Sequence, residues 1–405
     1  MSFQNLGLHP SLLQLLADIS FQTPTPIQSK VIPLALKQKD IIGLAQTGTG
    51  KTAAFALPIL HQLAISTRVK TRSPYALILA PTRELAIQIF DNIKTYATYL
   101  RLKIHCVYGG VKINPQMKNL RAGADILIAT PGRLIDLFQQ NAIELNGVKT
   151  LVLDEADRML DMGFIPDVKK IVKLLPYSRQ TMLFSATMTN EIRQLSQQFM
   201  SNPTEIQTSI VNQTASTVTH KMHPVDKAKK PDLLCHLLLD KRWSQALIFT
   251  KTKHAANKLV KYLYHSGIES MAIHGDKTQS QRIKALESFK NGKIPFLIAT
   301  DIASRGIDIQ DLDLVINYEL PQVAEDYVHR IGRTGRAGRA GHAISLVCAD
   351  EFLNLKAIEK LLKTNISREE IEDFCPHHQV PCSQNPNALK RKPKARVKTY
   401  SRKSS

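Results

Sequence analysis

Short runs of Val, Ile and Leu recur along the whole chain and limit what it can fold into. In the first half they are YALILA (75–80), IHCVY (104–108), DILIAT (125–130), TLVLDE (150–155) and TMLFSAT (181–187). The second half repeats the pattern with ALIFT (246–250), SMAIHG (270–275), PFLIAT (295–300), LVINYEL (314–320) and AISLVC (343–348). A turn signal or a longer stretch of helical periodicity, such as residues 83–100, separates the runs. Apolar strands alternating with helices predict parallel sheets that are covered on both faces.

One polar segment divides the chain. The 405 residues suit two domains of about 150–200 residues each. Residues 207–220, QTSIVNQTASTVTH, are rich in Ser, Thr and Asn and have no helical period, which is typical of a linker. We predict an α/β fold with two domains, each a mainly parallel sheet flanked by helices. The predicted boundaries are 1–207, a linker at 208–218, 219–374, and a disordered basic tail at 375–405.

The charge balance predicts a polyanionic partner. The chain has 54 Lys and Arg against 34 Asp and Glu, a net charge of +20. This favours nucleic acid first and an anionic membrane second. The last 18 residues contribute eight of the positive charges and no acid, so the rest of the chain still carries +12. We expect the tail to act as an electrostatic anchor for nucleic acid, or else only to keep the chain soluble.

Other features predict a cytoplasmic protein. No apolar run approaches the roughly 18 residues that span a bilayer, and the N-terminus does not have the pattern of a signal peptide. The five cysteines are irregularly spaced, as expected for reduced thiols. Cys375, His377, His378 and Cys382 in CPHHQVPC are zinc-ligand types. They lack the paired spacing of structural zinc sites, so we assign no metal to them.

The segment AQTGTGKT (45–52) has the arrangement of a phosphate-binding loop. It follows the strand-like DIIGL and precedes the helix-like residues 53–60. Gly48 and Gly50 allow backbone N–H groups to wrap phosphates, Lys51 reaches the terminal ones, and the Thr52 hydroxyl can ligate Mg²⁺. Ala45 stands where the standard pattern begins with Gly. The alternative is a Gly-rich turn without a ligand.

The segment TLVLDEADRML (150–160) supplies acidic side chains that can bind a metal ion next to that loop. Its apolar strand ends at Asp154 and Glu155, at the carboxyl edge where α/β sheets bind ligands. Asp154 suits Mg²⁺ held through water, and Glu155 suits orienting or deprotonating an attacking water. The alternative is an acidic cap on the next helix.

Asp154-Glu155-Ala156-Asp157 spells the signature of the DEAD-box ATP-dependent RNA helicases, and the chain resembles this family from about Phe3 to Leu362. The other family motifs follow in order: TPTPIQ ending at Gln28, PTREL (81–85), GG (109–110), TPGR (130–133), SAT (185–187), LIFT (247–250), QSQR (279–282), ATDIASRGID (299–308) and HRIGRTGR (329–336). The opening MSFQNLGL and the short C-terminal extension look most like the bacterial RhlE-type group.

The resemblance implies two RecA-like domains and an ATP site. Gln28 would pair with adenine, Phe21 would pack on its ring, and Asp308 would contact the ribose. The loop residues implied are Ala45, Gln46, Thr47, Gly48, Thr49, Gly50, Lys51 and Thr52. Phe3 either supports the same pocket or is an ordinary core residue. Ser20 departs from the family, which usually has Gly there, and we expect only a slightly different turn.

The resemblance also implies an RNA groove and a coupling element. Backbone contacts to RNA would carry no base information. The implied RNA residues are Thr82, Arg83, Gly109, Gly110, Thr130, Gly132, Arg133, Thr250, Gln279, Arg282 and Thr300. Ser185 and Thr187 would hydrogen-bond Asp157 and couple nucleotide state to domain geometry. Each of these residues taken alone is more often an ordinary surface or capping residue.

The stretch HRIGRTGRAGR (329–339) has arginines at every third position. It could lie along nucleic acid, close on a nucleotide's phosphates, or be a flexible basic loop. The resemblance assigns Arg333 and Arg336 to ATP's phosphates, with Arg336 as the arginine finger. Arg330 and His329 would organise the motif, Arg305 would brace it, and Arg339 stays ambiguous.

The implied activity is ATP-dependent, nonprocessive unwinding of short RNA duplexes, or remodelling of RNA–protein complexes, with ATP and Mg²⁺. Hydrolysis would require closure of the two domains. We expect a monomer that binds RNA and not membrane, with ribosomal precursors or RNA-degradation proteins as further partners. Three alternatives stay open: an ATP-gated RNA clamp without unwinding, a DNA-directed helicase, and an inactive scaffold.

Overall fold

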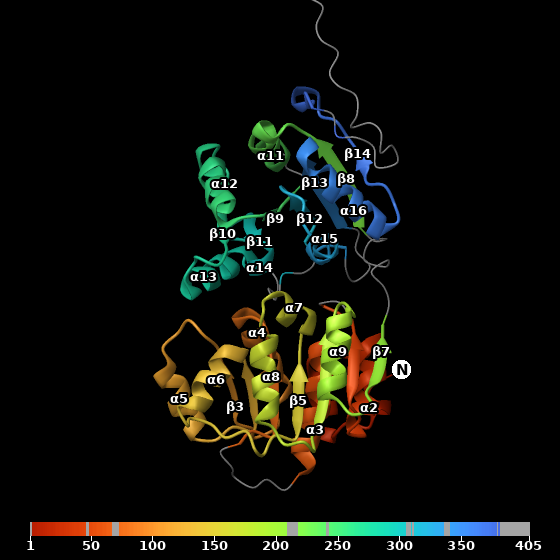
Figure 1. Ribbon diagram of the computed structural model, residues 1–405, viewed down its shortest axis with the longest axis vertical. Coiled ribbons are helices and arrows are strands. Elements are labelled where there is room, and N and C mark those ends of the chain that lie inside the picture. The colour runs from red at the N-terminus through yellow and green to blue at the C-terminus, as the bar shows by residue number, and fades with distance from the viewer. Residues whose placement is uncertain are drawn as a thin grey trace, which may run out of the picture. The chain divides into compact units, whose positions relative to one another are not determined.

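The described residues form two seven-stranded sheets, in which every strand pairing is parallel (Figure 1). They belong to two separate units. The computed structural model describes residues 2–45, 48–66, 73–208, 218–239, 243–304, 309, 312–335, 341–378 and 380. Each unit is described by itself below.

The first sheet has the strand order β3-β4-β2-β5-β6-β1-β7. Its strands are β1 (Ile41–Leu44), β2 (Ala76–Leu79), β3 (Ile104–Val107), β4 (Ile126–Ala129), β5 (Thr150–Leu153), β6 (Gln180–Ser185) and β7 (Thr204–Gln207). Its helices are η1 (Phe3–Leu6), α1 (Pro10–Asp18), α2 (Pro26–Leu36), α3 (Lys51–Ile65), α4 (Arg83–Tyr96), α5 (Ile113–Arg121), α6 (Pro131–Gln139), α7 (Ala156–Asp161), α8 (Ile165–Lys173) and α9 (Asn190–Phe199).

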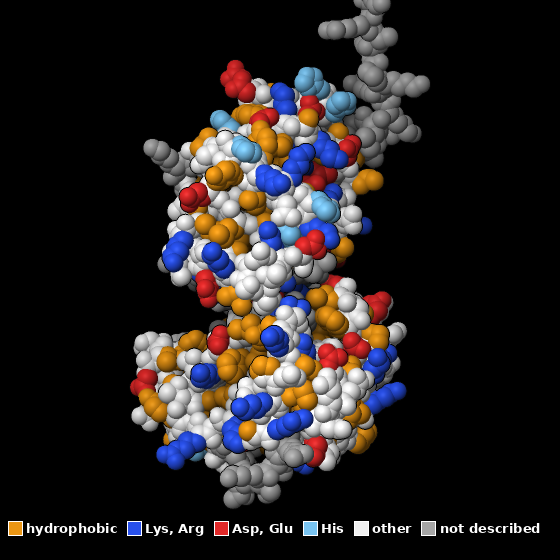
Figure 2. All heavy atoms as spheres, turned by 90° about the vertical axis from the view of Figure 1, so that its left-hand side faces the viewer, with side chains coloured by type: hydrophobic (Ala, Val, Ile, Leu, Met, Phe, Trp, Pro, Cys, Tyr) orange, Lys and Arg blue, Asp and Glu red, His pale blue; other side chains and the backbone are white. Residues whose placement is uncertain are grey.

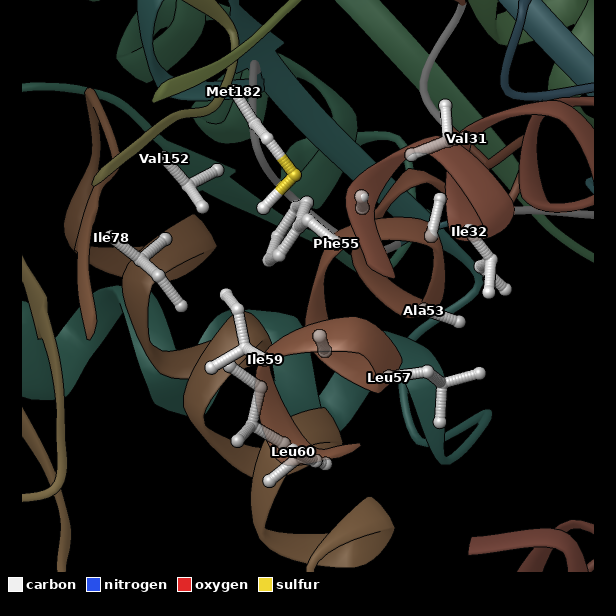
Figure 3. Packing of buried hydrophobic residues seen from close by; sticks show 14 of the residues in the cluster. Val31, Ile32, Ala53, Phe55, Leu57, Ile59, Leu60, Ile78, Val152 and Met182 are labelled. Carbon is white, nitrogen blue, oxygen red and sulfur yellow. The ribbon is translucent and has the colours of Figure 1, made fainter. Parts of the chain in front are cut away.

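Alternate residues of these strands enter two cores, one on each face of the sheet. On β2, Ile78 packs in the core that α1–α4 cover, whereas Leu77 and Leu79 pack in the core under α5–α9. Figure 3 shows side chains of α3, among them Phe55, directed toward the strand residues around Ile78 and Met182. Burying one such side chain contributes about 1.5–3 kcal/mol. This packing fixes α3, and therefore Lys51 at its first position, at the carboxyl edge of the sheet.

The second sheet has the order β10-β11-β9-β12-β13-β8-β14. Its strands are β8 (Val218–Pro224), β9 (Ala246–Thr250), β10 (Ser270–Ile273), β11 (Phe296–Thr300), β12 (Leu314–Asn317), β13 (Gly341–Val347) and β14 (Ser367–Arg368). Its helices are η2 (Lys227–Lys229), α11 (Lys230–Leu239), α12 (Lys253–His265), α13 (Gln279–Lys290), α14 (Asp301–Ser304), α15 (Ala324–Ile331), η3 (Ala349–Glu351), α16 (Phe352–Leu362) and η4 (Glu372–Phe374). Residues of α11 and α12 share one core with the strands, and residues of α15 and α16 share another.

The predicted α/β fold with two parallel sheets is confirmed, and each quoted apolar run contains a strand. The sequence did not reveal β7, β8 and β14, which lie at or beside the sheet edges. β7 and β8 mix polar and apolar residues, and in β7 only Ile206 is buried. β14 contains no apolar residue. The predicted linker ends at residue 218, whereas β8 already begins at Val218; residues 209–217 lie outside the described part.

The first residues of the predicted tail pack on the second unit. The His377 backbone N–H donates to Asp226 at 3.0 Å, and Val380 is 6% exposed in the core beside α16. These residues therefore belong to the folded unit. Residues 381–405, including Cys382 and the basic run, lie outside the described part.

Candidate functional site

The carboxyl edge of the first sheet carries two groups of motif residues. The phosphate loop follows β1, Asp154 follows β5, and the SAT segment overlaps the end of β6. These three strands are neighbours in the order β5-β6-β1. The predicted RNA residues follow β2, β3 and β4, which are neighbours on the other side of β5. The strand order therefore divides the edge into a nucleotide half and an RNA half.

The phosphate loop has the backbone that its glycines allow. Gly48 and Gly50 have φ values of 84° and 89°, in the left-handed region that residues with a Cβ rarely adopt. Gly50 is the N-cap of α3, so backbone N–H groups of the first helical turn are available to an anion. Ala45 is buried behind the loop. Gln46 and Thr47 lie outside the described residues.

Lys51 is suited to binding a phosphate, and Asp154 is suited to binding a divalent cation. The Lys51 side chain is buried, and its Nζ has no hydrogen-bond partner among the described residues. A buried ammonium group without an acceptor is costly, and phosphate oxygens would satisfy it. Burial raises the pKa of Asp154 to about 6, against the opposing charge of Lys51. Oxygen donors such as the Asp154 carboxylate and the Thr52 hydroxyl are those that Mg²⁺ prefers.

The elevated pKa of Asp154 predicts that the free energy of unfolding of the metal-free protein depends on pH. The folded state holds this proton up to about pH 6, whereas an unfolded Asp loses it near 3.8. Stability therefore falls as the pH rises from about 4 to 6, by on the order of 1–3 kcal/mol. We expect Asp154→Asn to stabilise the metal-free protein at pH 8, with a gain that shrinks toward pH 4.

Urea unfolding with a chelator, followed by circular dichroism at several pH values, measures this gain. Asp91→Asn, an exposed change on α4, is the control. A gain for Asp154→Asn that stayed constant over this pH range would contradict the assignment.

Glu155 is held by a residue that the sequence analysis missed. It has φ 53° at the N-cap of α7, and its backbone N–H donates to Asp154 Oδ1 at 3.0 Å. Its Oε2 lies 2.6 Å from Arg158 Nη1, in an ion pair whose side chains are only 9% and 6% exposed. The i, i+3 spacing of Glu155 and Arg158 was a signal that could have revealed the pair.

Asp157 joins the DEAD segment to the SAT segment. Its Oδ2 accepts the backbone N–H groups of Ala186 and Thr187, both at 3.0 Å, and the Thr187 hydroxyl at 3.2 Å. The expected bond from Ser185 to Asp157 is not formed. The buried Ser185 hydroxyl instead donates to the Thr187 carbonyl at 2.7 Å, because its strand ends before the turn. Ser185 shapes the turn, and Thr187 contacts Asp157.

Gln28 connects the segment before α2 to the phosphate loop. Its Oε1 accepts the Thr25 N–H at 2.8 Å, and its Nε2 donates to the Gly50 carbonyl at 3.2 Å. A Cβ at position 50 would collide with this amide. One N–H and one lone pair of the amide remain, which is what the edge of adenine requires.

Phe21 stacks on the buried Phe3, with ring centroids 5.6 Å apart. Ser20, just before it, has φ 58°, so the family's usual Gly would fit this turn without strain. We expect Ser20→Gly to stabilise the first unit by about 0.5–1 kcal/mol, measured by thermal unfolding. Ser29→Gly, within α2, should destabilise it instead. A loss of stability with Ser20→Gly would show that the turn carries no strain.

The RNA half brings its predicted residues together around one loop. The Arg83 guanidinium lies against Gly110, where any Cβ would collide with it. Arg133 donates to the Val111 carbonyl at 3.0 Å and to Gln116 Oε1 at 3.1 Å. Arg133 therefore holds the glycine loop in place, and Gln116, which the sequence analysis missed, is its partner.

The N-termini of helices α4 and α6 also lie in the RNA half of the edge. Thr82 and Thr130 are the N-caps of α4 and α6, so backbone N–H groups of both helices point to this edge. The Thr82 hydroxyl accepts the Leu85 N–H at 3.3 Å. A Cβ added at Gly132, in the first turn of α6, would meet nothing within 4 Å, so this turn is open.

The second sheet has a similar division. Thr250 ends β9, Thr300 ends β11, and Gln279 and Arg282 lie in the first turn of α13, which follows β10. These strands are neighbours in the order β10-β11-β9. The arginine-rich segment follows β12 through α15, on the other side of β9. Asp308, Arg305, Arg336 and Arg339 lie outside the described residues.

Arg330 is a buried structural centre of the second unit. It is 2% exposed, and its Nε and Nη2 donate to the two Asp301 oxygens at 2.6 and 2.7 Å. Its Nη1 donates to Asn317 Oδ1 at 3.0 Å and to the Glu319 carbonyl at 2.6 Å. Its guanidinium also lies over the Phe249 ring, 4.9 Å from the centroid. Arg330 thus ties the ends of three strands to α15, as expected, and Arg333 follows at the end of that helix.

The histidines of the CPHHQVPC segment contact a carboxylate. The Nδ1 atoms of His377 and His378 lie 2.6 and 3.7 Å from Asp226 oxygens. Within the described residues no group of three or more His, Cys, Asp or Glu side chains is arranged to hold a metal ion. Among those residues, no helix has both the length and the apolar character that crossing a membrane requires.

Comparisons with known proteins agree with this arrangement. Residues 25–195 match the DEAD/DEAH box helicase family, and residues 229–338 match the helicase conserved C-terminal domain. The chain is 43% identical to the ATP-dependent RNA helicase RhlB of Pseudomonas syringae, covering 91% of this chain and 94% of that protein. It is 41% identical to the ATP-dependent RNA helicase DeaD of Haemophilus influenzae, covering 94% of this chain but only 61% of that longer protein.

Solved structures agree as well. Dbp5 of S. cerevisiae, bound to RNA and ADP BeF3, matches with a TM-score of 0.83 at 34% identity and covers 92% of this chain and 96% of that one. A DEAD box protein from Methanococcus jannaschii is 42% identical, with a TM-score of 0.52 over 91% of this chain and 99% of that one. The sequence motifs, the two parallel-sheet units and these relatives place the chain in the DEAD-box family of ATP-dependent RNA helicases, which are RNA-stimulated ATPases.

Proposed function

We propose that this chain hydrolyses ATP when its two units close on RNA, and that closure separates short duplexes locally. The observation that best supports this is the common layout of the two sheets. In each unit the predicted RNA residues follow three neighbouring strands, whereas the phosphate loop and the DEAD segment of the first unit, and the arginine-rich segment of the second, follow strands on the other side. Ligands of open parallel sheets bind outside the carboxyl ends of the strands.

The nucleotide half of the first unit binds ATP. The phosphate loop and Lys51 hold the phosphates, and Gln28 selects adenine. Thr52 and Asp154 hold Mg²⁺, partly through water; when bound, this ion neutralises charge on the phosphates. Glu155 orients or deprotonates the attacking water, and Arg158 positions the Glu155 carboxylate. The 2.6 Å contact between Glu155 and Arg158 supports this last role.

Arg333 and Arg336 of the second unit complete the reaction. They stabilise charge on the transferring phosphoryl group, and an arginine supplied this way contributes on the order of 10³–10⁵ in rate. RNA bound by both units favours closure, so RNA stimulates hydrolysis and ATP strengthens RNA binding by the same factor. Each cycle separates a few base pairs, which makes the unwinding nonprocessive. Asp157 and Thr187 couple the nucleotide site to this closure.

The subgroup within the family, the cellular location, the oligomeric state and the partners are also part of the proposal. The RhlE-type group suits the opening segment MSFQNLGL. A cytoplasmic monomer that acts on ribosomal precursors, or alongside RNA-degradation proteins, suits the basic charge.

Replacing Arg336 by Ala tests the closure step. We expect ATP hydrolysis to fall by about 10³-fold or more while binding of a fluorescent ATP analogue stays measurable. Arg368→Ala, an arginine of β14, is the control. Near-wild-type hydrolysis by Arg336→Ala would contradict the finger. A strand-displacement assay with ATP and a nonhydrolysable analogue separates unwinding from ATP-gated clamping, because a clamp binds RNA without displacing a strand.

A further inference from the structure

Helix α12 carries a stripe of basic side chains that no motif explains. Its 13 residues, Lys253–His265, include no Asp or Glu. Its basic side chains are all exposed: Lys253, His254, Lys258, Lys261 and His265. Like charges three or four residues apart disfavour a helix, so this composition does not serve helix stability.

Four of these side chains lie on one line. An α-helix turns by about 100° per residue, so His254, Lys258, Lys261 and His265 fall within an arc of about 60°. The apolar residues Ala256, Leu259 and Leu263 point the opposite way and are buried in the core against β9–β11. The packing of α12 therefore turns the whole stripe to solvent. Figure 2 views the side of the second unit that carries α12 and shows Lys, Arg and His side chains at that surface.

The charges of Lys258 and Lys261 are not neutralised by other described residues. Lys258 and Lys261 form no ion pair or hydrogen bond within the described residues. Asp232 on the adjacent helix α11 accepts a hydrogen bond from the Tyr262 hydroxyl. Tyr264 at the far end of the stripe is 75% exposed, and its ring lies 6.0 Å from that of His265.

The stripe begins at the predicted RNA edge. Helix α12 starts three residues after Thr250, at the carboxyl end of β9, and runs toward the opposite edge of the sheet. From His254 to His265 the axial distance is about 16 Å, which is long enough for the stripe to contact more than one phosphate of a strand.

We propose that the exposed face of α12 binds the phosphate backbone of an RNA strand that leaves the motif-lined edge. This rests on the proposed function, which places RNA at that edge. A row of basic side chains with an exposed aromatic ring is typical of surfaces that bind single strands without sequence preference. Membrane-binding helices need a broad apolar face beside the charges, and the exposed face of α12 has only Tyr264.

The test uses the full chain with Lys258→Gln and Lys261→Gln combined. ATP hydrolysis is measured against the concentration of two oligouridylates: the shortest that fully stimulates the wild type, and the same strand extended at both ends. We expect the concentration of extended RNA for half-maximal stimulation to rise about tenfold, with the maximal rate and the short RNA unaffected. The slope of log affinity against log salt for extended RNA should fall in magnitude by about 1.4, for two lost phosphate contacts.

Lys356→Gln with Lys360→Gln is the matched control, because these exposed lysines lie four residues apart on α16 of the same unit. An unchanged affinity for extended RNA in the α12 variant, or an equal loss in the control, would overturn the proposal. Loss of binding to phosphatidylserine vesicles with RNA affinity intact would identify a membrane surface instead. Failure of any RNA to stimulate the wild type would refute the proposed function itself.

Discussion

Replacing Glu155 by Gln is expected to lower RNA-stimulated ATP hydrolysis by about 10²–10⁴-fold. Gln has the size of Glu but cannot accept a proton, so it cannot activate the attacking water. The side chain is 9% exposed beside Asp154, at the end of β5, where the nucleotide half of the edge begins. Lys51 and Gln28 are untouched, so ATP affinity should change little. Steady-state phosphate release and titration with a fluorescent ATP analogue measure the two effects.

Two controls separate chemistry from folding. The change leaves the buried Arg158 with a weaker partner, so the free energy of unfolding is measured alongside activity. Glu144→Gln, an exposed acid between α6 and β5, should leave both properties unchanged. Hydrolysis within about twofold of wild type, in a folded Glu155→Gln variant, would show that another group activates the water.

The second large effect is on the stability of the second unit. Arg330→Met should lower its free energy of unfolding by about 3–5 kcal/mol. The change leaves the Asp301 carboxylate, Asn317 and the Glu319 carbonyl without their shared donor. The chain has a single tryptophan, Trp243, which lies in this unit, so its fluorescence in urea reports on this unfolding.

An exposed ion pair in the same unit gives the comparison. Lys221 and Glu369 are 2.8 Å apart, but their side chains are 45% and 52% exposed. Lys221→Met should cost no more than about 1 kcal/mol, because solvent screens the pair. Adding Asp301→Asn to Arg330→Met should recover part of the loss, because the stranded carboxylate is removed. Equal effects of Arg330→Met and Lys221→Met would show that burial does not set the strength of the Arg330 network.

Much of the candidate site could be predicted because its residues follow recognisable strands. The glycines at 48 and 50, Lys51 and the carboxylates at 154 and 155 all stand next to apolar runs, where local pattern is informative. The partners that hold them were harder to predict. Arg158 is three residues from Glu155, but Asp301 and Asn317 are 29 and 13 residues from Arg330 and meet it only through the fold. The prediction of a hydrogen bond from Ser185 to Asp157 was wrong. The direction of the Ser185 hydroxyl group depends on the geometry of the turn that follows, which the sequence does not reveal.

The sequence by itself determined that its apolar runs form strands and which residues stand at the carboxyl ends of those strands. Burial on both faces of a parallel sheet requires continuous apolar runs, and turn residues must follow them. The order of the strands within each sheet was decided only by the tertiary structure, because strand pairing depends on helices packing against residues far away in the chain. That order, β3-β4-β2-β5-β6-β1-β7 in the first unit, separates the residues predicted to bind RNA from the phosphate loop and the DEAD segment along one edge. The packing of Leu259 and Leu263 likewise decided that the basic face of α12 points to solvent.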